Sequence, residues 1–332
     1  MFATRWRLLI IILAILLFLA SILSLLSGKY PLALNELWHS LLSGGKGGSD
    51  ADSVLWKLRL PRLFAAIVVG AALAVAGSTY QAIFRNPLVS PDILGVSAGA
   101  GLGAVLAIFL NLPFAGVQLF AFVGGMLAVA LVYLLSSSSR HFDPVLVLVL
   151  AGVAIGSLLS AGISLVKILA DPYSQLSTMT FWLLGGLNSV SQREILWALP
   201  FVLLGLIPLI LLRWRVNLLS LGDMDGRALG LNTGLLRLIL IACATLITAA
   251  VVSFAGIIAW VGLVIPHIAR LLVGAEFSRL MPTSLLIGAV FLTLTDTIAR
   301  NAANIELPLG VLTSLIGAPF FLYLLIKGGR RG

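Results

Sequence analysis

Few side chains in this sequence could take part in chemistry, and the clearest candidate is an acid–base pair inside an apolar stretch. Asp296 lies near the end of such a stretch and Arg300 follows four residues later, so a helix would place both on one face. A carboxylate inside a membrane is costly, and it serves either ion-coupled transport or pairing with a cation. No second acidic residue stands in the middle of an apolar stretch. We therefore expect Asp296 to pair with Arg300.

The histidines do not form a metal-binding pattern. His39, His141 and His267 are each more than ten residues apart, and no group of Cys, His, Asp or Glu has the spacing of metal ligands. We expect no metal site in this chain. His267 is expected near the cytoplasmic end of a helix, packed with Pro266 and Arg270.

The stretch "LLSGGKGGS" at 41–49 resembles part of an ATPase signature but does not bind nucleotide by itself. A phosphate-binding loop needs G-x-x-x-x-G-K-[ST], whose backbone N–H groups and lysine hold the phosphates, and the chain has no such segment. We expect a flexible loop here and no cofactor in this chain. If ATP drives this protein, a partner binds the ATP and its Mg²⁺.

The composition is that of a membrane protein. Of the 332 residues, 60% are hydrophobic and 10% are charged, whereas a soluble domain has about 25% charged residues. A spanning helix needs about 20 mostly apolar residues. Apolar stretches suited to about ten spans lie at 7–27, 63–82, 93–110, 116–136, 144–166, 194–212, 236–254, 257–272, 283–299 and 309–326.

The basic residues give the orientation of these spans. The net charge of +9 is divided among the connections, so it does not indicate nucleic-acid binding. Placing the amino terminus in the cytoplasm puts thirteen of the 21 Lys and Arg residues inside and eight outside, as the positive-inside rule requires. Both termini are then cytoplasmic. We expect 7–27 to be a retained first span rather than a cleaved signal, because no small-x-small cleavage site follows it.

The connections and small residues give further expectations. The longest inner connection, 213–235, is Gly-punctuated and rich in leucine, which predicts a short helical hairpin whose apolar residues contact a protein partner. Gly256, in the nearly unbroken apolar run "SFAG", allows a tight turn between two spans. Small residues four apart, at 95, 99 and 103 and at 70, 74 and 78, predict close helix packing within the chain.

Several stretches together resemble one family. They are "RLPR" at 59–62, "RNPLVSPDILGVSAGAG" at 85–101, "LSLGDMDGRALGLN" at 219–232, "GIIAWVGLVIPHIAR" at 256–270 and "ELPLGVLTSLIGAPFF" at 306–321. They are similar to the signature segments of FecCD/BtuC-like permeases, the ten-span subunits of bacterial ABC importers for iron–siderophore, haem and cobalamin. The resemblance implies an all-α polytopic membrane protein of the type II ABC importer permease fold, forming a single domain over 1–332.

The resemblance also implies partners. These are a second permease subunit in a homodimer, two cytoplasmic ABC ATPase subunits and an extracytoplasmic substrate-binding protein, all at the inner membrane. The hairpin at about 215–232 would insert into the ATPase, and the residues that match this coupling motif are Leu219, Gly222, Asp223, Arg227, Leu229 and Gly230. The arginines that would receive glutamates of the binding protein are Arg59, Arg62 and Arg300.

Two more groups of residues follow from the same resemblance. The pathway would run along the dimer axis and be lined partly by 144–166 and 181–190, with candidate residues Gly152, Gly156, Ser160, Lys167, Gly185 and Gly186. Residues that match structural motifs of the family are Asn86, Pro87, Pro91, Gly95, Pro266, His267, Arg270, Asp296, Glu306, Pro308 and Gly310.

The expected function is therefore inward passage of a metal chelate, driven by ATP hydrolysis on partner subunits, and not catalysis by this chain. A ferric siderophore is expected first, and haem or cobalamin next. The alternatives are an oxyanion such as molybdate, an ion-coupled secondary transporter that uses Asp296, and a membrane enzyme. Lys167 fits either an anionic substrate or a lysine that extends to the membrane surface. The enzyme alternative lacks any convergent set of nucleophile, base or metal ligands.

Overall fold

The chain folds into a bundle of helices. The computed structural model describes residues 2–30, 32–138, 144–219 and 222–328, and within these ranges there is no β-strand. The helices are α1 (Phe2–Leu26), α2 (Leu34–Ser43), α3 (Asp50–Ser53), η1 (Val54–Arg59), α4 (Leu60–Ile83), η2 (Pro91–Leu94), α5 (Val96–Phe109), α6 (Phe114–Ser138), α7 (Pro144–Leu169), α8 (Gln175–Leu184), α9 (Gln192–Leu219), α10 (Asp223–Ala228), α11 (Thr233–Ala255), α12 (Val261–Val273), α13 (Phe277–Asn301) and α14 (Leu309–Gly328).

The long helices have the length and composition of membrane spans. In the described part of the chain, seven helices are long and apolar enough to cross a membrane, and three shorter apolar helices fall in α5, α12 and α14. Each of the ten predicted apolar stretches overlaps one of these helices. The short helices differ from the prediction, since 14 residues in α5 rise only about 21 Å against a hydrocarbon core of about 30 Å.

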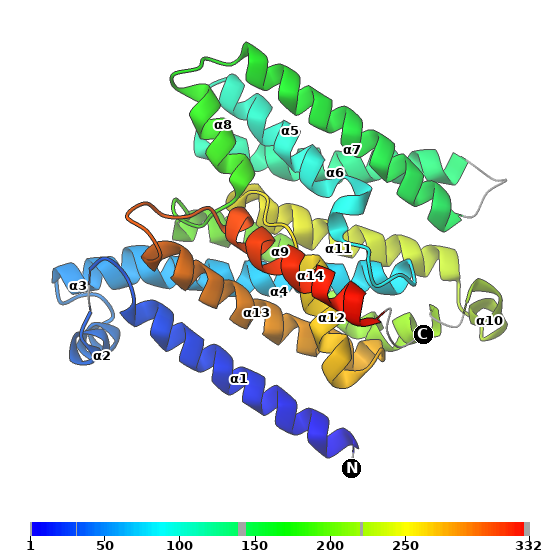
Figure 1. The fold of residues 1–332 in the computed structure, drawn as a ribbon, viewed down its shortest axis with the longest axis horizontal. Helices are drawn as coiled ribbons and strands as arrows, with labels where there is room; N and C mark the ends of the chain where they lie inside the picture. Colours follow the sequence, from blue (N-terminus) through cyan, green and yellow to red (C-terminus); the bar gives the residue numbers. More distant parts are fainter. Residues whose placement is uncertain (1, 31, 139–143, 220–221, 329–332) are drawn as a thin grey trace.

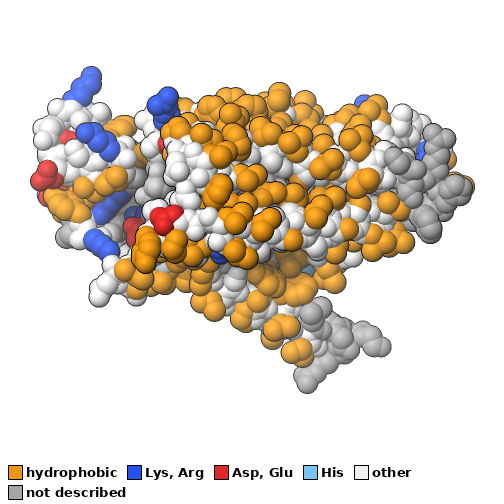
Figure 2. Space-filling model, turned by 90° about the horizontal axis from the view of Figure 1, so that it is seen from above, with side chains coloured by type: hydrophobic (Ala, Val, Ile, Leu, Met, Phe, Trp, Pro, Cys, Tyr) orange, Lys and Arg blue, Asp and Glu red, His pale blue; other side chains and the backbone are white. Residues whose placement is uncertain are grey.

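The centre of the bundle is formed by α4 and α11. Helix α4 packs against α11, α12 and α13, and α11 also packs against α6 and α9. Both central helices are mostly buried, whereas α1 and α7 expose most of their surface. Figure 1 shows why, because α1 and α7 lie along opposite edges of the molecule. Apolar side chains cover most of the surface seen in Figure 2, and charged side chains gather at one end.

Glycines let neighbouring helices come into backbone contact. A Cβ on Gly70 of α4 would overlap the carbonyl oxygen of Gly288 on α13, and one on Gly99 of α5 would overlap that of Gly124 on α6. These contacts lie within one chain. The prediction that the small-residue stripes serve packing inside the chain is therefore confirmed at these positions.

Two segments have structure that the apolar pattern of the sequence did not predict. The stretch 28–62 is largely helical, because α2 forms within it and a continuous helix starts at Asp50 and runs into α4. The segment 256–270 is not one helix, because residues 256–260 form a turn before α12 begins at Val261. Trp260, at the end of that turn, has a left-handed backbone with φ of 71°.

Candidate functional site

A buried ionic cluster lies at the end of the bundle that carries α2, which we name the arginine end. The Asp296 side chain, on α13, is 1% exposed, and its carboxylate is 2.9 Å from Nη2 of Arg62 and 3.2 Å from Nε of Arg300. Arg62 Nε also donates to Oδ1 at 2.9 Å and Oδ2 at 3.1 Å. The predicted pair with Arg300 is present, and Arg62 adds a second cation from α4. Two guanidiniums around one carboxylate offset the cost of burying its charge.

Glu306 extends the cluster towards the surface. It precedes α14, is about one-third exposed, and accepts from Nη1 of Arg62 at 2.8 Å. Arg62 therefore bridges a buried acid and a partly exposed one. The sequence could not show this link, because Arg62 is 234 positions from Asp296 and 244 from Glu306.

The other two predicted docking arginines cap helix α1. Arg59, 6% exposed, donates to the carbonyl oxygens of Leu25, Leu26 and Tyr30. Arg300 donates through Nη2 to the carbonyl oxygen of Ser24 at 3.1 Å and to its Oγ at 2.8 Å. Cations near the last carbonyls of a helix satisfy unpaired acceptors and the helix dipole.

The structure thus brings the three predicted docking arginines together. It also shows that each guanidinium already bonds within the chain. Charge reversal at Arg59 would place a carboxylate against backbone carbonyls, so it is expected to disturb the fold as well as any docking. The docking role stays a prediction.

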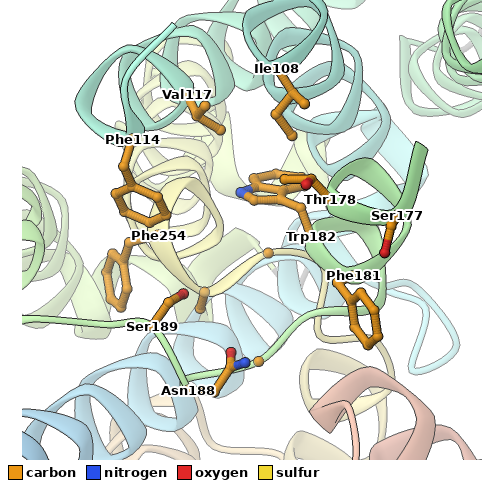
Figure 3. Close-up of a pocket in the computed structure, with 13 residues that line it drawn as sticks. Ile108, Phe114, Val117, Ser177, Thr178, Phe181, Trp182, Asn188, Ser189 and Phe254 are labelled. Atoms are coloured by element: carbon orange, nitrogen blue, oxygen red, sulfur yellow. The ribbon is translucent and has the colours of Figure 1, made fainter. Parts of the chain in front are cut away.

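A cavity of about 450 Å³ opens among α5, α6, α8 and α11. Its wall combines aromatic and aliphatic side chains with four small polar ones, and in the described chain no charged residue lines it. Figure 3 shows Phe114 and Phe254 beside each other, with Trp182 across the space from them. The lining residues are Ile108, Phe114, Val117, Ser177, Thr178, Phe181, Trp182, Gly186, Asn188, Ser189, Phe254, Ala255 and Gly256.

The predicted pathway residues are only partly at this cavity. Gly186 lines it, and the predicted segment 181–190 supplies much of its wall. Gly152 and Gly156 instead pack against the turn at 93–95, where a Cβ on Gly152 would overlap the carbonyl oxygen of Ile93. Ser160 is exposed on α7 and Lys167 is half-buried near the end of that helix.

Sequence reasoning missed the share of α5, α6 and α11 in this wall. Ile108, Phe114 and Phe254 read as ordinary core residues. No spacing signal distinguishes a cavity wall from a packed core.

Three backbone segments meet at glycines beside the cavity. Gly186 N–H donates to the carbonyl oxygen of Ala255 at 2.8 Å, and Leu309 N–H donates to that of Gly185 at 2.9 Å. A Cβ on Gly256 would overlap the carbonyl oxygen of Trp182. Gly256 also has φ of 67°, a conformation that strains residues with side chains. The expected tight turn at Gly256 is therefore present, and it fixes the end of α8 against α11 and α14.

The opposite end of the bundle carries α10, and we name it the α10 end. Where the hairpin was predicted, the described chain has one short helix, α10, between α9 and α11 (Figure 1), and residues 215–219 continue α9. Leu219 is buried, whereas Arg227, Leu229 and Gly230 are exposed, and Met224 is 84% exposed. Gly222 begins α10 beside the Arg85 guanidinium. Ser220 and Leu221 lie outside the described residues, as does the side chain of Asp223.

Polar side chains also meet beneath α10. Arg270 Nη2 donates to Oε1 of Gln81 at 2.8 Å. Its Nη1, and Nδ1 of His267, are buried and have no hydrogen-bond partner among the described residues. A cavity of about 300 Å³ is lined there by Arg85, Asn86, Pro87, Asn217 and Arg270, among others. His267 was expected at a helix end, but α12 continues to Val273.

The remaining motif residues shape turns and helix starts. Asn86 Oδ1 accepts from the backbone N–H of Leu88 at 2.9 Å, which closes the turn around Pro87. Pro91 starts η2, and Gly95 ends it with φ of 78°. Pro308 and Gly310 flank the start of α14, where a Cβ on Gly310 would crowd the carbonyl oxygen of Leu184. Of the residues with described side chains, no three His, Cys, Asp or Glu could hold a metal ion together.

Comparison with known proteins decides the family. The model of the FecCD transport family matches residues 13–327. The chain belongs to the FecCD transport family. One relative is an iron chelatin transport system permease protein of Helicobacter pylori, which is 41% identical over 92% of this chain and 94% of that protein.

Other relatives of this FecCD chain carry different cargo. The vitamin B12 import system permease of Escherichia coli is 38% identical over 98% of this chain and 96% of its own length. The molybdate import system permease of Haemophilus influenzae is 37% identical and covers 96% of both chains.

A solved structure agrees with the fold. A metal-chelate type ABC transporter in an inward-facing conformation is 36% identical, with a TM-score of 0.87 over 96% of this chain and 98% of that one. The protein is therefore a multi-pass permease subunit of an ABC importer. Such a subunit is not itself an enzyme.

Proposed function

We propose that this permease carries a metal chelate inward across the cytoplasmic membrane, a ferric siderophore first and haem or cobalamin next. The observation that carries the proposal is the wall of the 450 Å³ cavity, which has aromatic and hydroxyl groups and, in the part of the chain described, no charge. Such a wall holds a bulky ligand weakly. Weak binding suits a pathway, because a strong site would trap its cargo.

The partners belong to this proposal. Two copies of the chain would form the pathway, two ATPase subunits would bind ATP and Mg²⁺, and an extracytoplasmic protein would deliver the chelate. The α10 end would be cytoplasmic, with both termini on that side, and Met224 and Leu229 would contact the ATPase. Arg59, Arg62 and Arg300 would form the docking surface for the binding protein. ATP binding would shift the two membrane halves between outward- and inward-facing packings.

An oxyanion such as molybdate is the second candidate cargo. The molybdate permease of Haemophilus influenzae, at 37% identity over 96% of both chains, supports it. The absence of charge from the described cavity wall favours the chelate. An ion-coupled carrier is disfavoured, because both oxygens of Asp296 already face arginines.

Purification from the native host in mild detergent tests the proposal. We expect an ATPase subunit and a binding protein to co-elute in fixed ratio. Reconstitution of that complex in liposomes should give ATP-dependent uptake of ⁵⁵Fe-siderophore and little uptake of ⁹⁹Mo-molybdate. Uptake driven by an ion gradient without ATP would overturn the proposal of an ATP-driven importer. ATP-dependent uptake of molybdate with little uptake of the siderophore would identify the oxyanion as the cargo in place of the chelate.

A further inference from the structure

Helix α2 has three distinct faces. Successive residues are about 100° apart around a helix, so Leu34, Trp38 and Leu42 share one side. These three side chains are 69%, 63% and 70% exposed. Leu37 and Ser40 point to a second side and are buried. The third side carries Asn35, Glu36 and His39, which are exposed and polar.

The buried face holds α2 firmly to the bundle. Leu37 packs in a cluster with Leu25 of α1, Leu55 of η1 and Leu63 of α4. Trp56 Nε1 donates to the carbonyl oxygen of Ser40 at 3.1 Å. The helix therefore has a defined rotation, and its exposed apolar face is a fixed feature of the surface.

That apolar face continues the lipid-facing surface of a spanning helix. Figure 1 shows α2 beside the end of α1, and α1 exposes Leu19 and Leu23 near that end. Leu58, on η1, is also 63% exposed. Trp56 is also partly exposed, so two tryptophans occur at this level, as is typical of a membrane–water interface.

We infer that α2 lies in the boundary between lipid headgroups and acyl chains at the arginine end. Leu34 and Trp38 enter the lipid, and Glu36 and His39 face water. Leu42 and Asn35, about 20° apart around the helix, lie at the boundary between the two sides. A helix with one apolar and one polar face binds in this way without spanning. The lipid surface is favoured over a docking protein because the apolar face adjoins the exposed side of α1, which is itself a membrane span.

The arrangement has a consequence for the arginine cluster. Arg59 donates to the carbonyl oxygens of Leu25 and Leu26, and Leu25 also packs on α2. If α2 is anchored at the membrane interface, it fixes the depth in the membrane at which Arg59 contacts the end of α1. Arg59 and the ion pairs next to it then lie at headgroup level.

Spin labels in lipid nanodiscs test this inference. Cys243 is the only cysteine, so a Cys243→Ala background allows one label at a time. We compare Leu34→Cys with His39→Cys, because both side chains are exposed on the same helix and, at about 100° per residue, they point about 140° apart. In phosphatidylcholine nanodiscs the label at 34 should be relaxed mainly by oxygen, and the label at 39 mainly by a water-soluble nickel chelate. The accessibility ratio should differ severalfold.

Two results would overturn it. Equal access of the nickel chelate to both labels would show that the apolar face is in water. Access of the nickel chelate to the label at 34 that is lost only when purified binding protein is added would assign the apolar face to protein docking. Retention of the same gel-filtration profile by both variants separates either result from misfolding.

Discussion

At the arginine end of the bundle, three guanidiniums and two carboxylates bind one another or the end of α1. At the α10 end, large apolar side chains are left open, since Met224 and Leu229 are 84% and 60% exposed. A closed ionic cluster resists rearrangement because each change strands a buried charge. An open end can change partners at little cost. The difference indicates that the arginine end resists rearrangement more strongly than the α10 end does.

The largest expected effect is at the centre of the closed end. Asp296→Asn removes the charge that balances Arg62 and Arg300, and we expect it to lower stability by about 3–5 kcal/mol. Thermal unfolding of the detergent-purified protein, followed by gel filtration, measures this. Thr297→Ser, one position along the same helix, is the control and should change little. A wild-type melting curve for Asp296→Asn would mean that the cluster is not what makes this end rigid.

A smaller effect is expected between the two ends, at the cavity wall. Gly256→Ala puts a Cβ against the carbonyl oxygen of Trp182 at a backbone angle that strains alanine. We expect a loss of about 1–3 kcal/mol in the same assay. Gly274→Ala is the matched control, because it also has positive φ but has open space around its Cβ. Equal losses in both variants would attribute the cost to φ alone and leave the contact with α8 unimportant.

The sequence predicted this central architecture better than it predicted the ends. Apolar length and periodicity located the membrane helices, and small residues at 70 and 99 marked real backbone contacts. The pairing of Arg62 with Asp296 could not be predicted from the sequence, because only folding brings α4 beside α13. The four residues before Val261 are apolar and were predicted as part of a span, but they form a turn in which Trp260 takes a left-handed backbone.

A substitution at the α10 end should change ATPase binding and leave the stability of the protein nearly unchanged. Leu229→Glu changes a 60% exposed side chain, so stability should stay within about 0.5 kcal/mol. Binding of the ATPase subunit should weaken about tenfold, or about 1.4 kcal/mol, as measured by titration in nanodiscs. Ile305→Glu is the matched control, since Ile305 is 75% exposed next to Glu306 at the arginine end. If both variants bind the ATPase equally, α10 is not the contact.

The smallest effect is expected at the surface side of the arginine end. Glu306→Gln removes the charge of the more exposed of the two carboxylates that pair with Arg62. Glu306 is about one-third exposed, whereas Asp296 is 1% exposed. Solvent screens the outer ion pair, so its loss should lower stability by less than about 1 kcal/mol. The difference from wild type should also shrink as salt is raised from about 0.1 M to 1 M, because the screening length falls from about 10 Å to 3 Å. A loss as large as that of Asp296→Asn, unchanged by salt, would mean that Arg62 needs both acids. The closed cluster would then extend to the surface, and a docking carboxylate could replace Glu306 only by opening it.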